Sequence, residues 1–164
     1  MLLAIYFMVT AKHSIQEVIS AVAIQAGTKI DKPDIKEYEG DDLSWRLQAE
    51  TAEEKGKNVI LKNPVFDFYT DKRELIPIQS KKGRYDKKSG LMHFEGAVQV
   101  KYQSWELNSE KLDYSKTKEE VQVAEDFVMF QEGMKITGKD MRIIKQTGRV
   151  KVLKGVKMSI EENH

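Results

Sequence analysis

The sequence repeats itself at an interval of 29 residues, and this repeat restricts the fold more than any other feature. Shifting the chain by that interval aligns three segments in which apolar and polar side chains alternate. Successive side chains on a β-strand point to opposite faces, so a shared alternation gives every copy the same inward face. The sequence therefore predicts three stacked β units with one continuous apolar interior. The aligned apolar sets are Met92, Phe94, Val98 and Val100; Val121, Val123, Phe127 and Met129; and Val150, Val152, Val156 and Met158.

Each unit is predicted to be a strand, a short polar turn, and a longer strand that is broken near its middle. The turns fall at 86–89, 115–118 and 144–147. The breaks fall at Gly96, Glu125 and Lys154, where an inward position is lost or becomes polar, as at a β-bulge. The repeat leaves two possibilities open: the apolar faces pack into a dry core, or they leave a gap between two sheets for an apolar ligand.

The chain between residue 28 and the first repeat also favours strands. Pro33 discourages helix, residues 39–42 (EGDD) are typical of a turn, and apolar residues alternate from Leu43 to Leu47. Residues 58–70 (NVILKNPVFDFYT) are rich in β-branched and aromatic residues, with Asn63-Pro64 as a bulge or edge break. No long helical pattern follows residue 56, so an all-β domain is predicted.

Charge and composition exclude several classes of function. Lysine and arginine (27) nearly balance aspartate and glutamate (26), and a net charge of +1 argues against nucleic acid as a partner. The absence of cysteine removes thiolate catalysis, cysteine-ligated zinc and disulfides. The three histidines are scattered, and no nucleotide-binding or hydrolase motif occurs, so we expect no enzyme, no metal and no cofactor.

The first 27 residues differ from the rest of the chain. Residues 1–11 (MLLAIYFMVTA) are apolar throughout, but they supply only about half of the roughly 20 residues that a membrane-spanning helix needs. Residues 14–26 have apolar side chains at helical spacing, although a linker or a first strand is also possible. Three interpretations of the start stay open: a buried or interfacial helix, a truncated membrane anchor, and a mis-assigned start.

Five segments of the chain, in this order and spacing, resemble the LptC family of the bacterial lipopolysaccharide export machinery. They are LSWRLQAETAE (43–53), NVILKNPVFDFY (58–69), GRYDKKSGLMHFEGAVQV (83–100), LNSEKLDYSKTKEEVQV (107–123) and EGMKITGKDMRII (132–144). The resemblance spans about residues 30–160. It implies a twisted β-jellyroll of two opposed antiparallel sheets, related to LptA and to the N-terminal domain of LptD. The expected organisation is an apolar or helical segment at 1–27, the jellyroll at 28–160 and a tail at 161–164.

The resemblance also implies a function and a set of partners. Members bind lipopolysaccharide in an apolar groove, receive it from the permease–ATPase complex of LptB, LptF and LptG, and pass it to LptA. The N-terminal strands, around residues 35–47, would face the permease, and the C-terminal strands, around 150–160, would face LptA. The implied location is the periplasm, with an N-terminal helix that anchors the protein in the inner membrane and is incomplete in this sequence. Two alternatives remain: a soluble bridge protein like LptA, and a structural β module with a dry core.

Candidate site residues are chosen by two criteria: the face of the strand on which the side chain is expected to lie, and the resemblance to the family. For the lipid-binding groove they are Leu61, Phe94, Val98, Phe127, Val152 and Met158. For partner docking they are Ile35, Trp45, Gly133, Val156 and Ile160. Plain core packing is an equally good explanation for each apolar residue, and a turn that needs positive φ is an equally good explanation for Gly133.

Overall fold

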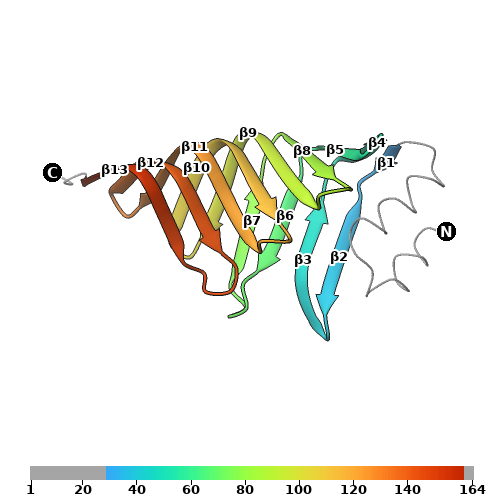
Figure 1. Ribbon diagram of the computed structural model, residues 1–164, viewed down its shortest axis with the longest axis horizontal. Helices are drawn as coiled ribbons and strands as arrows, with labels where there is room; N and C mark the ends of the chain where they lie inside the picture. The colour runs from blue at the N-terminus through green and yellow to red at the C-terminus, as the bar shows by residue number, and fades with distance from the viewer. Residues whose placement is uncertain (1–28, 161–164) are drawn as a thin grey trace.

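The computed structural model describes residues 29–160, which form thirteen β-strands and no helix (Figure 1). Short strands come first along the chain and five long strands follow. The short ones are β1 (Lys29–Asp31), β2 (Asp34–Glu39), β3 (Asp42–Gln48), β4 (Thr51–Lys55), β5 (Asn58–Lys62), β6 (Val65–Tyr69), β7 (Leu75–Gln79) and β8 (Lys82–Asp86). The long ones are β9 (Leu91–Tyr102), β10 (Trp105–Ser115), β11 (Glu120–Gln131), β12 (Met134–Ile144) and β13 (Val150–Ile160).

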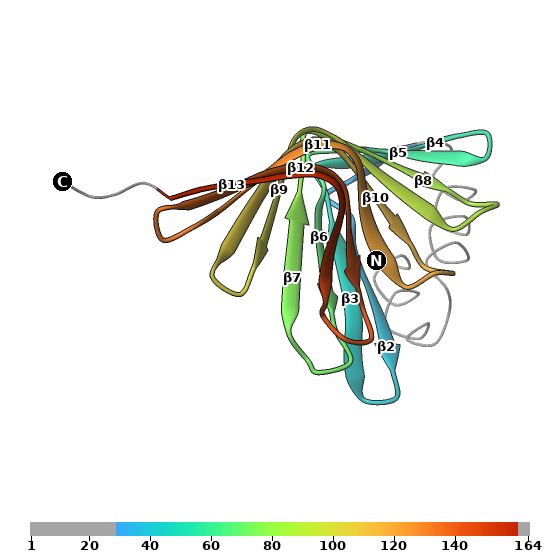
Figure 2. The ribbon, with the colours of Figure 1, turned by 60° about the vertical axis from the view of Figure 1, so that its left-hand side comes forward.

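The strands form one antiparallel sheet that divides into two layers at β9. The first half of β9 pairs with β8, and its second half pairs with β7. Layer one therefore contains β1, β4, β5 and β8, and layer two contains β2, β3, β6 and β7. The long strands β9–β13 pair in sequence and run through both layers, which fan out from a shared edge (Figure 2). This is the predicted arrangement of two opposed antiparallel sheets.

Bulges bend the long strands where they pass from one layer to the other. In β9 the bend follows Glu95, where Gly96 has a φ of 83° and Ala97 a φ of 47°. The register of β11 shifts between Val123 and Asp126, and β13 shifts beside Lys154. The three predicted breaks are thus confirmed. The intervening strands β10 and β12 shift at the same level, so one line of bulges crosses the whole repeat region.

The repeat turns lie about one residue after their predicted positions, at 87–90, 116–119 and 145–149. The predicted turn at 39–42 is confirmed as the β2–β3 hairpin, with Gly40 at a φ of 65°. At Asn63-Pro64 the break is complete, because Lys62 pairs with Lys82 in layer one and Val65 pairs with Gln48 in layer two. The segment 58–70 consequently forms two strands in different layers.

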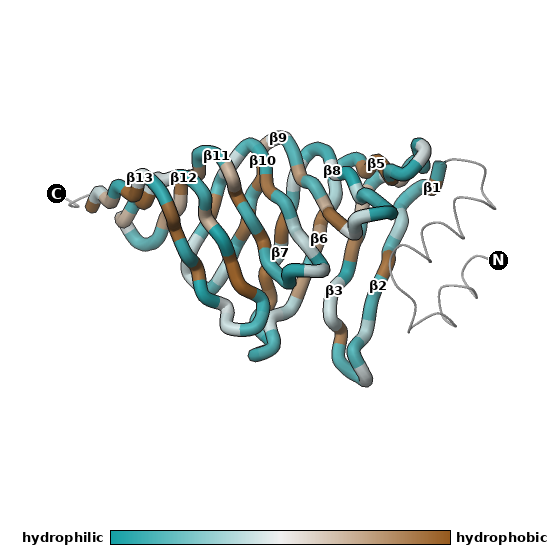
Figure 3. The backbone as a smooth tube through the Cα atoms, viewed as in Figure 1, coloured by the Kyte–Doolittle hydropathy of each residue, from teal (hydrophilic) through white to brown (hydrophobic). Residues whose placement is uncertain are grey.

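The core lies between the two layers and draws apolar side chains from both. Apolar and polar stretches alternate along the strands (Figure 3), as expected for sheets with one buried face. Layer two contributes Trp45, Phe66 and Phe68, and layer one contributes Phe94 and Tyr114. Because each layer has one apolar face, neither could be stable without the other.

The N-terminal and C-terminal expectations lie outside the described residues. These are the apolar or helical segment at 1–27 and the tail at 161–164, so the predicted domain boundaries stay predictions. Within residues 29–160 no helix is long and apolar enough to cross a membrane.

Candidate functional site

The three repeats present the same inward face but bury it to different extents. The inward side chains of β9 (Met92, Phe94, Val98, Val100) and of β11 (Val121, Val123, Phe127, Met129) are all buried. On β13 the corresponding side chains are more open to solvent: Val150 is 37%, Val156 55% and Met158 60% exposed, and Val152 is only partly buried. Ile160, at the end of the same strand, is 70% exposed. The reason is topological, since β13 pairs with β12 alone among the described strands. The apolar interior therefore continues to the C-terminal edge of the sheet and is uncovered there.

Between the first two repeats the interior is filled by aromatic rings. Phe66 lies at the centre, with ring centroids 5.8 Å from Trp45, 5.9 Å from Phe94 and 5.1 Å from Tyr114. An apolar hollow beside these rings, lined also by Tyr85, Met92, Gly90 and Lys116, has a volume of only about 10 Å³. This is no more space than one water molecule needs, so an acyl chain does not fit in this arrangement.

The predicted groove residues separate into two groups. Leu61, Phe94, Val98 and Phe127 are fully buried core residues that belong to one apolar cluster. Val152 is partly buried against the same cluster, and Met158 lies on the uncovered face of β13. The structure thus places all six on the inward side, but only Val152 and Met158 are at its open end.

The predicted docking residues separate in the same way. Ile35 and Trp45 are buried in the core of layer two, so their side chains are not on the surface. Gly133 is exposed in the β11–β12 turn with a φ of 77°, which is the geometry of a turn glycine. Val156 and Ile160 lie on the same uncovered face as Met158.

The raised pKa values of three tyrosines indicate that the interior contains little water. Burial raises the pKa of the Tyr85 hydroxyl to about 12, with smaller contributions from Glu37 and Asp86. Burial also raises the pKa of Tyr114, which lies against Phe66 and Phe68. Tyr102 has its pKa raised to about 12 by burial and by its hydrogen bond to Glu74. The charged form is disfavoured in each case because little water reaches these sites.

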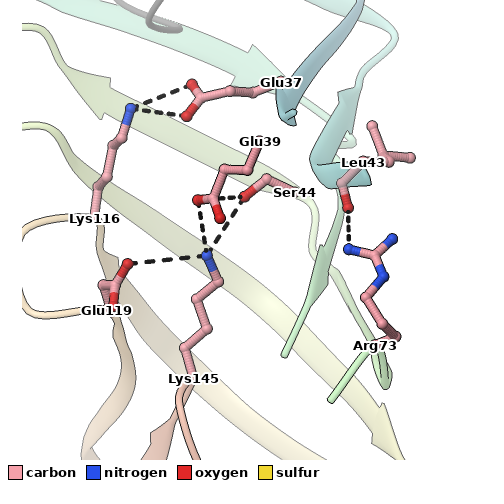
Figure 4. A network of polar contacts seen from close by, with 8 residues as sticks. All are labelled: Glu37, Glu39, Leu43, Ser44, Arg73, Lys116, Glu119 and Lys145. Atoms are coloured by element: carbon pink, nitrogen blue, oxygen red, sulfur yellow. Dashed lines mark hydrogen bonds and ion pairs between the residues drawn. The ribbon is translucent and has the colours of Figure 1, made fainter. Parts of the chain in front are cut away.

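Polar contacts join the two layers on the side opposite the bulges, which we call the mouth of the interior. Lys145, in the β12–β13 turn of layer one, is buried, and its Nζ lies 3.5 Å from Glu39 and 3.4 Å from the Ser44 hydroxyl, both in layer two (Figure 4). A second carboxylate, Glu119 of the β10–β11 turn, lies 4.0 Å away. A buried ammonium group requires such partners.

Further contacts cross the mouth, among them a backbone hydrogen bond of 3.4 Å from the Asp71 amide in the β6–β7 loop to the Lys145 carbonyl. Lys116 Nζ donates to both carboxylate oxygens of Glu37, at 3.0 and 3.2 Å, and so connects the β10–β11 turn to β2. The Tyr102 hydroxyl, at the end of β9 in layer two, lies 3.0 Å from the Gly148 carbonyl of the β12–β13 turn and 2.8 Å from the Glu74 carboxylate, so its one proton is shared between the two acceptors. Gly148 has a φ of 64°, and a Cβ at this position would clash with the tyrosine hydroxyl, so the close approach requires glycine.

The sequence reasoning missed these mouth residues. Lys145 and Lys116 fall in or beside predicted polar turns, where a lysine is typical of a solvated surface. No periodic signal distinguishes a turn lysine that reaches across to another layer from one that extends into water.

The structure supplies no cluster suited to metal binding within residues 29–160. His93 lies on the outer face of layer one, where its Nδ1 is 2.5 Å from the Asp113 carboxylate. It pairs with one carboxylate, and a metal site of the usual kind needs at least three protein ligands.

Comparisons with known proteins agree with this architecture. Residues 53–161 match the sequence profile of the family described as "Lipopolysaccharide-assembly, LptC-related". No curated protein sequence matches the chain at a significant level. A similar solved structure is that of LptH from Pseudomonas aeruginosa, described as the LptA homologous periplasmic component of the conserved lipopolysaccharide transport device. It is 14% identical, with a TM-score of 0.54 over 72% of this chain and 95% of that chain.

The structural likeness shows the jellyroll fold, and the family profile covers more than half of the chain. The chain belongs to the LptC-related family of lipopolysaccharide assembly proteins.

Proposed function

We propose that this protein binds lipopolysaccharide through its apolar interior and passes it along the sheet. It receives the lipid from the permease–ATPase complex of LptB, LptF and LptG in the inner membrane and hands it to LptA. The protein acts in the periplasm as a carrier and not as an enzyme. The family assignment supports this role. An interior built from repeated strands with equivalent apolar side chains supports it as well.

The uncovered face of β13 is the observation that carries the proposal. Val156, Met158 and Ile160 expose more than half of their surfaces, yet they continue the line of side chains that is buried on β9 and β11. An apolar interior that reaches a sheet edge can be continued by the interior of a second jellyroll. The second protein would add its own edge strand to β13 by backbone hydrogen bonding, as in β-augmentation.

The opposite end of the sheet offers the complementary edge. Among the described strands, β1 pairs with β4 alone and β2 with β3 alone, so both layers end there. We assign this end to the permease, as the resemblance implies. Ile35 and Trp45 would support docking from within, by holding β2 and β3 in place, because their side chains are buried.

Transport requires moderate affinity. Each CH₂ group removed from water contributes about 0.8 kcal/mol, so complete burial of several acyl chains would hold the lipid too tightly to move. An open groove lined by repeated strands with similar apolar side chains gives the lipid many weak and equivalent binding positions. The partly buried Val152 and the exposed Met158 fit such a groove better than the fully buried Leu61, Phe94, Val98 and Phe127.

A photo-cross-linking experiment tests this proposal. A photoactivatable amino acid at Met158 should capture lipopolysaccharide when the purified protein is loaded with it. Lys157 is the matched control, because it is the neighbouring residue of the same strand and points to the other face. Equal capture at the two positions, or none at Met158, would contradict the proposal.

The packed interior supports a second candidate, a structural module with a dry core that binds only proteins. Here the aromatic cluster around Phe66 would be a permanent core. The protein purified from a lipopolysaccharide-producing host would then carry no acyl chains, and added lipopolysaccharide would leave its tryptophan fluorescence unchanged.

A further inference from the structure

The interior must change shape before it can hold an acyl chain. The aromatic cluster leaves about 10 Å³ beside Trp45 and Phe66, far less than a lipid tail requires. The buried side chains come from both layers and contact one another directly. Lipid can therefore enter beside this aromatic cluster only if the layers move apart there.

The two sides of the jellyroll differ in how they join the layers. On the bulge side the connection is covalent, since all five long strands continue from one layer into the other. The bulges follow one line, and several residues along it have positive φ: Gly96 at 83°, Asp140 at 53° and Gly155 at 61°. Irregular backbone of this kind can act as a hinge, because a few dihedral angles there absorb a rotation of the layers.

On the mouth side the layers are joined by polar side chains. Lys145 reaches from layer one to Glu39 and Ser44 in layer two, and Lys116 reaches to Glu37. Tyr102 reaches in the other direction to the backbone of Gly148. The partly exposed Lys116 can exchange Glu37 for water at small net cost. The buried Lys145 can leave Glu39 and Ser44 only when water enters the mouth to solvate its ammonium group, so its contacts break together with the opening.

The position of these contacts relates them to lipid entry. Lys116 pairs with Glu37 and also lines the apolar hollow beside Trp45, Tyr85 and Tyr114. Separating Lys116 from Glu37 would therefore uncover aromatic surface directly beneath. The β13 end, beyond these contacts, already exposes its apolar face.

We propose that Lys145 with Glu39 and Ser44, Lys116 with Glu37, and Tyr102 with Gly148 form a polar latch that holds the mouth closed until lipid enters. The structure is the closed state, and opening turns the layers about the line of bulges. This inference rests on the proposed lipid-carrying function and adds a gate to it. It assigns to turn residues a role in the rate of lipid loading.

The test uses the fact that the chain contains no cysteine. The double variant Glu37→Cys and Lys116→Cys is joined across the mouth with a short bifunctional methanethiosulfonate linker, which a reductant later removes. The matched control is Asp34→Cys with Arg46→Cys, which replaces an ion pair within layer two and spans no mouth. Uptake of lipopolysaccharide is followed by tryptophan fluorescence before and after reduction.

We expect the linker across the mouth to slow uptake by at least about tenfold, and reduction to restore it, because loading requires the layers to separate. The control linker should leave the rate unchanged. Equal uptake by linked and reduced protein would overturn the latch and leave lipid binding intact. No uptake by the unmodified protein would overturn the proposed function together with the latch.

A second measurement does not depend on the uptake rate. Spin labels on the same two cysteines report the distance across the mouth. Lipopolysaccharide should lengthen this distance, while labels at the Asp34 and Arg46 positions should stay at constant separation. An unchanged distance across the mouth in lipid-loaded protein would overturn the latch.

Discussion

The rings of Phe66, on β6, and Tyr114, on β10, lie 5.1 Å apart and join the two layers of the jellyroll at its centre. Phe66 also contacts Trp45, Phe68 and Phe94, so four aromatic neighbours from both layers meet at one side chain. We therefore expect the packing around Phe66 to hold the two layers together more strongly than any single polar contact at the mouth.

Replacing the central ring should therefore be costly. Phe66→Ala should lower the free energy of unfolding by about 3–5 kcal/mol, because the ring is fully buried and its space cannot be refilled. Chemical denaturation measures this loss. Phe130→Ala is the matched control, since Phe130 is 43% exposed and should cost much less. Equal losses would mean that the layers do not depend on the cluster.

The buried tyrosines predict a loss of stability at high pH. Their folded-state pKa values are raised, so their contribution is complete below the ordinary value of 10.0 and decreases as the pH rises toward about 12. Each such tyrosine can remove up to about 1.4 kcal/mol per pH unit in this window. Denaturation at a series of alkaline pH values measures the slope, and Tyr114→Phe should reduce it. A stability that stays level over this window would contradict the burial of these hydroxyls.

The pair of Asp34 and Arg46 predicts a small effect at low pH. The hydrogen bond from Arg46 lowers the pKa of Asp34, so its stabilising contribution is present above the ordinary value of 3.8 and is lost as the pH falls below it. Because both groups are partly exposed, Asp34→Asn should cost at most about 1 kcal/mol near neutral pH. The two proteins should become equally stable in acid. A difference that persists in acid would point to a cause other than charge.

The space around Gly138 on β12, next to β13, is too small for a larger side chain. Gly138 lies opposite Phe127, and a Cβ there would come within 3.1 Å of the Phe127 ring, 3.0 Å of Val152 and 3.2 Å of the Lys154 carbonyl. Gly138→Ala should therefore destabilise the protein by about 1–3 kcal/mol through overpacking. Thr137→Ala, on the other face of the same strand, is the control for thermal unfolding measurements. An unaffected Gly138→Ala protein would mean that β13 is displaced easily.

The unequal burial of the repeats predicts unequal protection of their backbones. Amides of β13 should exchange with deuterium faster than those of β9, because β13 has one strand neighbour among the described residues and β9 has three. Exchange measured by mass spectrometry on the isolated protein tests this. Adding a partner that extends the sheet should slow the exchange of β13 and leave β9 unchanged. Equal protection of the two strands would contradict an open end.

Much of this fold could be predicted because it depends on local alternation. The alternation of apolar and polar residues can be seen directly in one sequence. It predicts the inward side chains of β9 and β11 and the breaks at Gly96, Glu125 and Lys154. Burial could not be predicted in the same way. Val156 has the same pattern as Val98, yet one is exposed and the other is buried, because burial depends on which strand lies alongside.

The mouth contacts could not be predicted for a related reason. Lys145 and Glu39 are distant in the sequence, and their meeting depends on how far one layer twists over the other. Trp45 shows a similar limit. Its place near the N-terminal edge of the sheet predicted a docking residue. Its side chain lies on the inward face of β3, so the ring is buried in the core.

The exposed strand β13 also determines what the protein must avoid. An apolar strand with an unpaired edge is the usual starting point for self-association, and two copies could meet there as readily as two partners. Lys151, Lys154 and Lys157 all lie on this strand. Two such strands brought together would oppose three lysines with three more, whereas a strand that carries carboxylates would meet no such repulsion. The charges of β13 thus disfavour the pairing of this edge with a second copy of the chain.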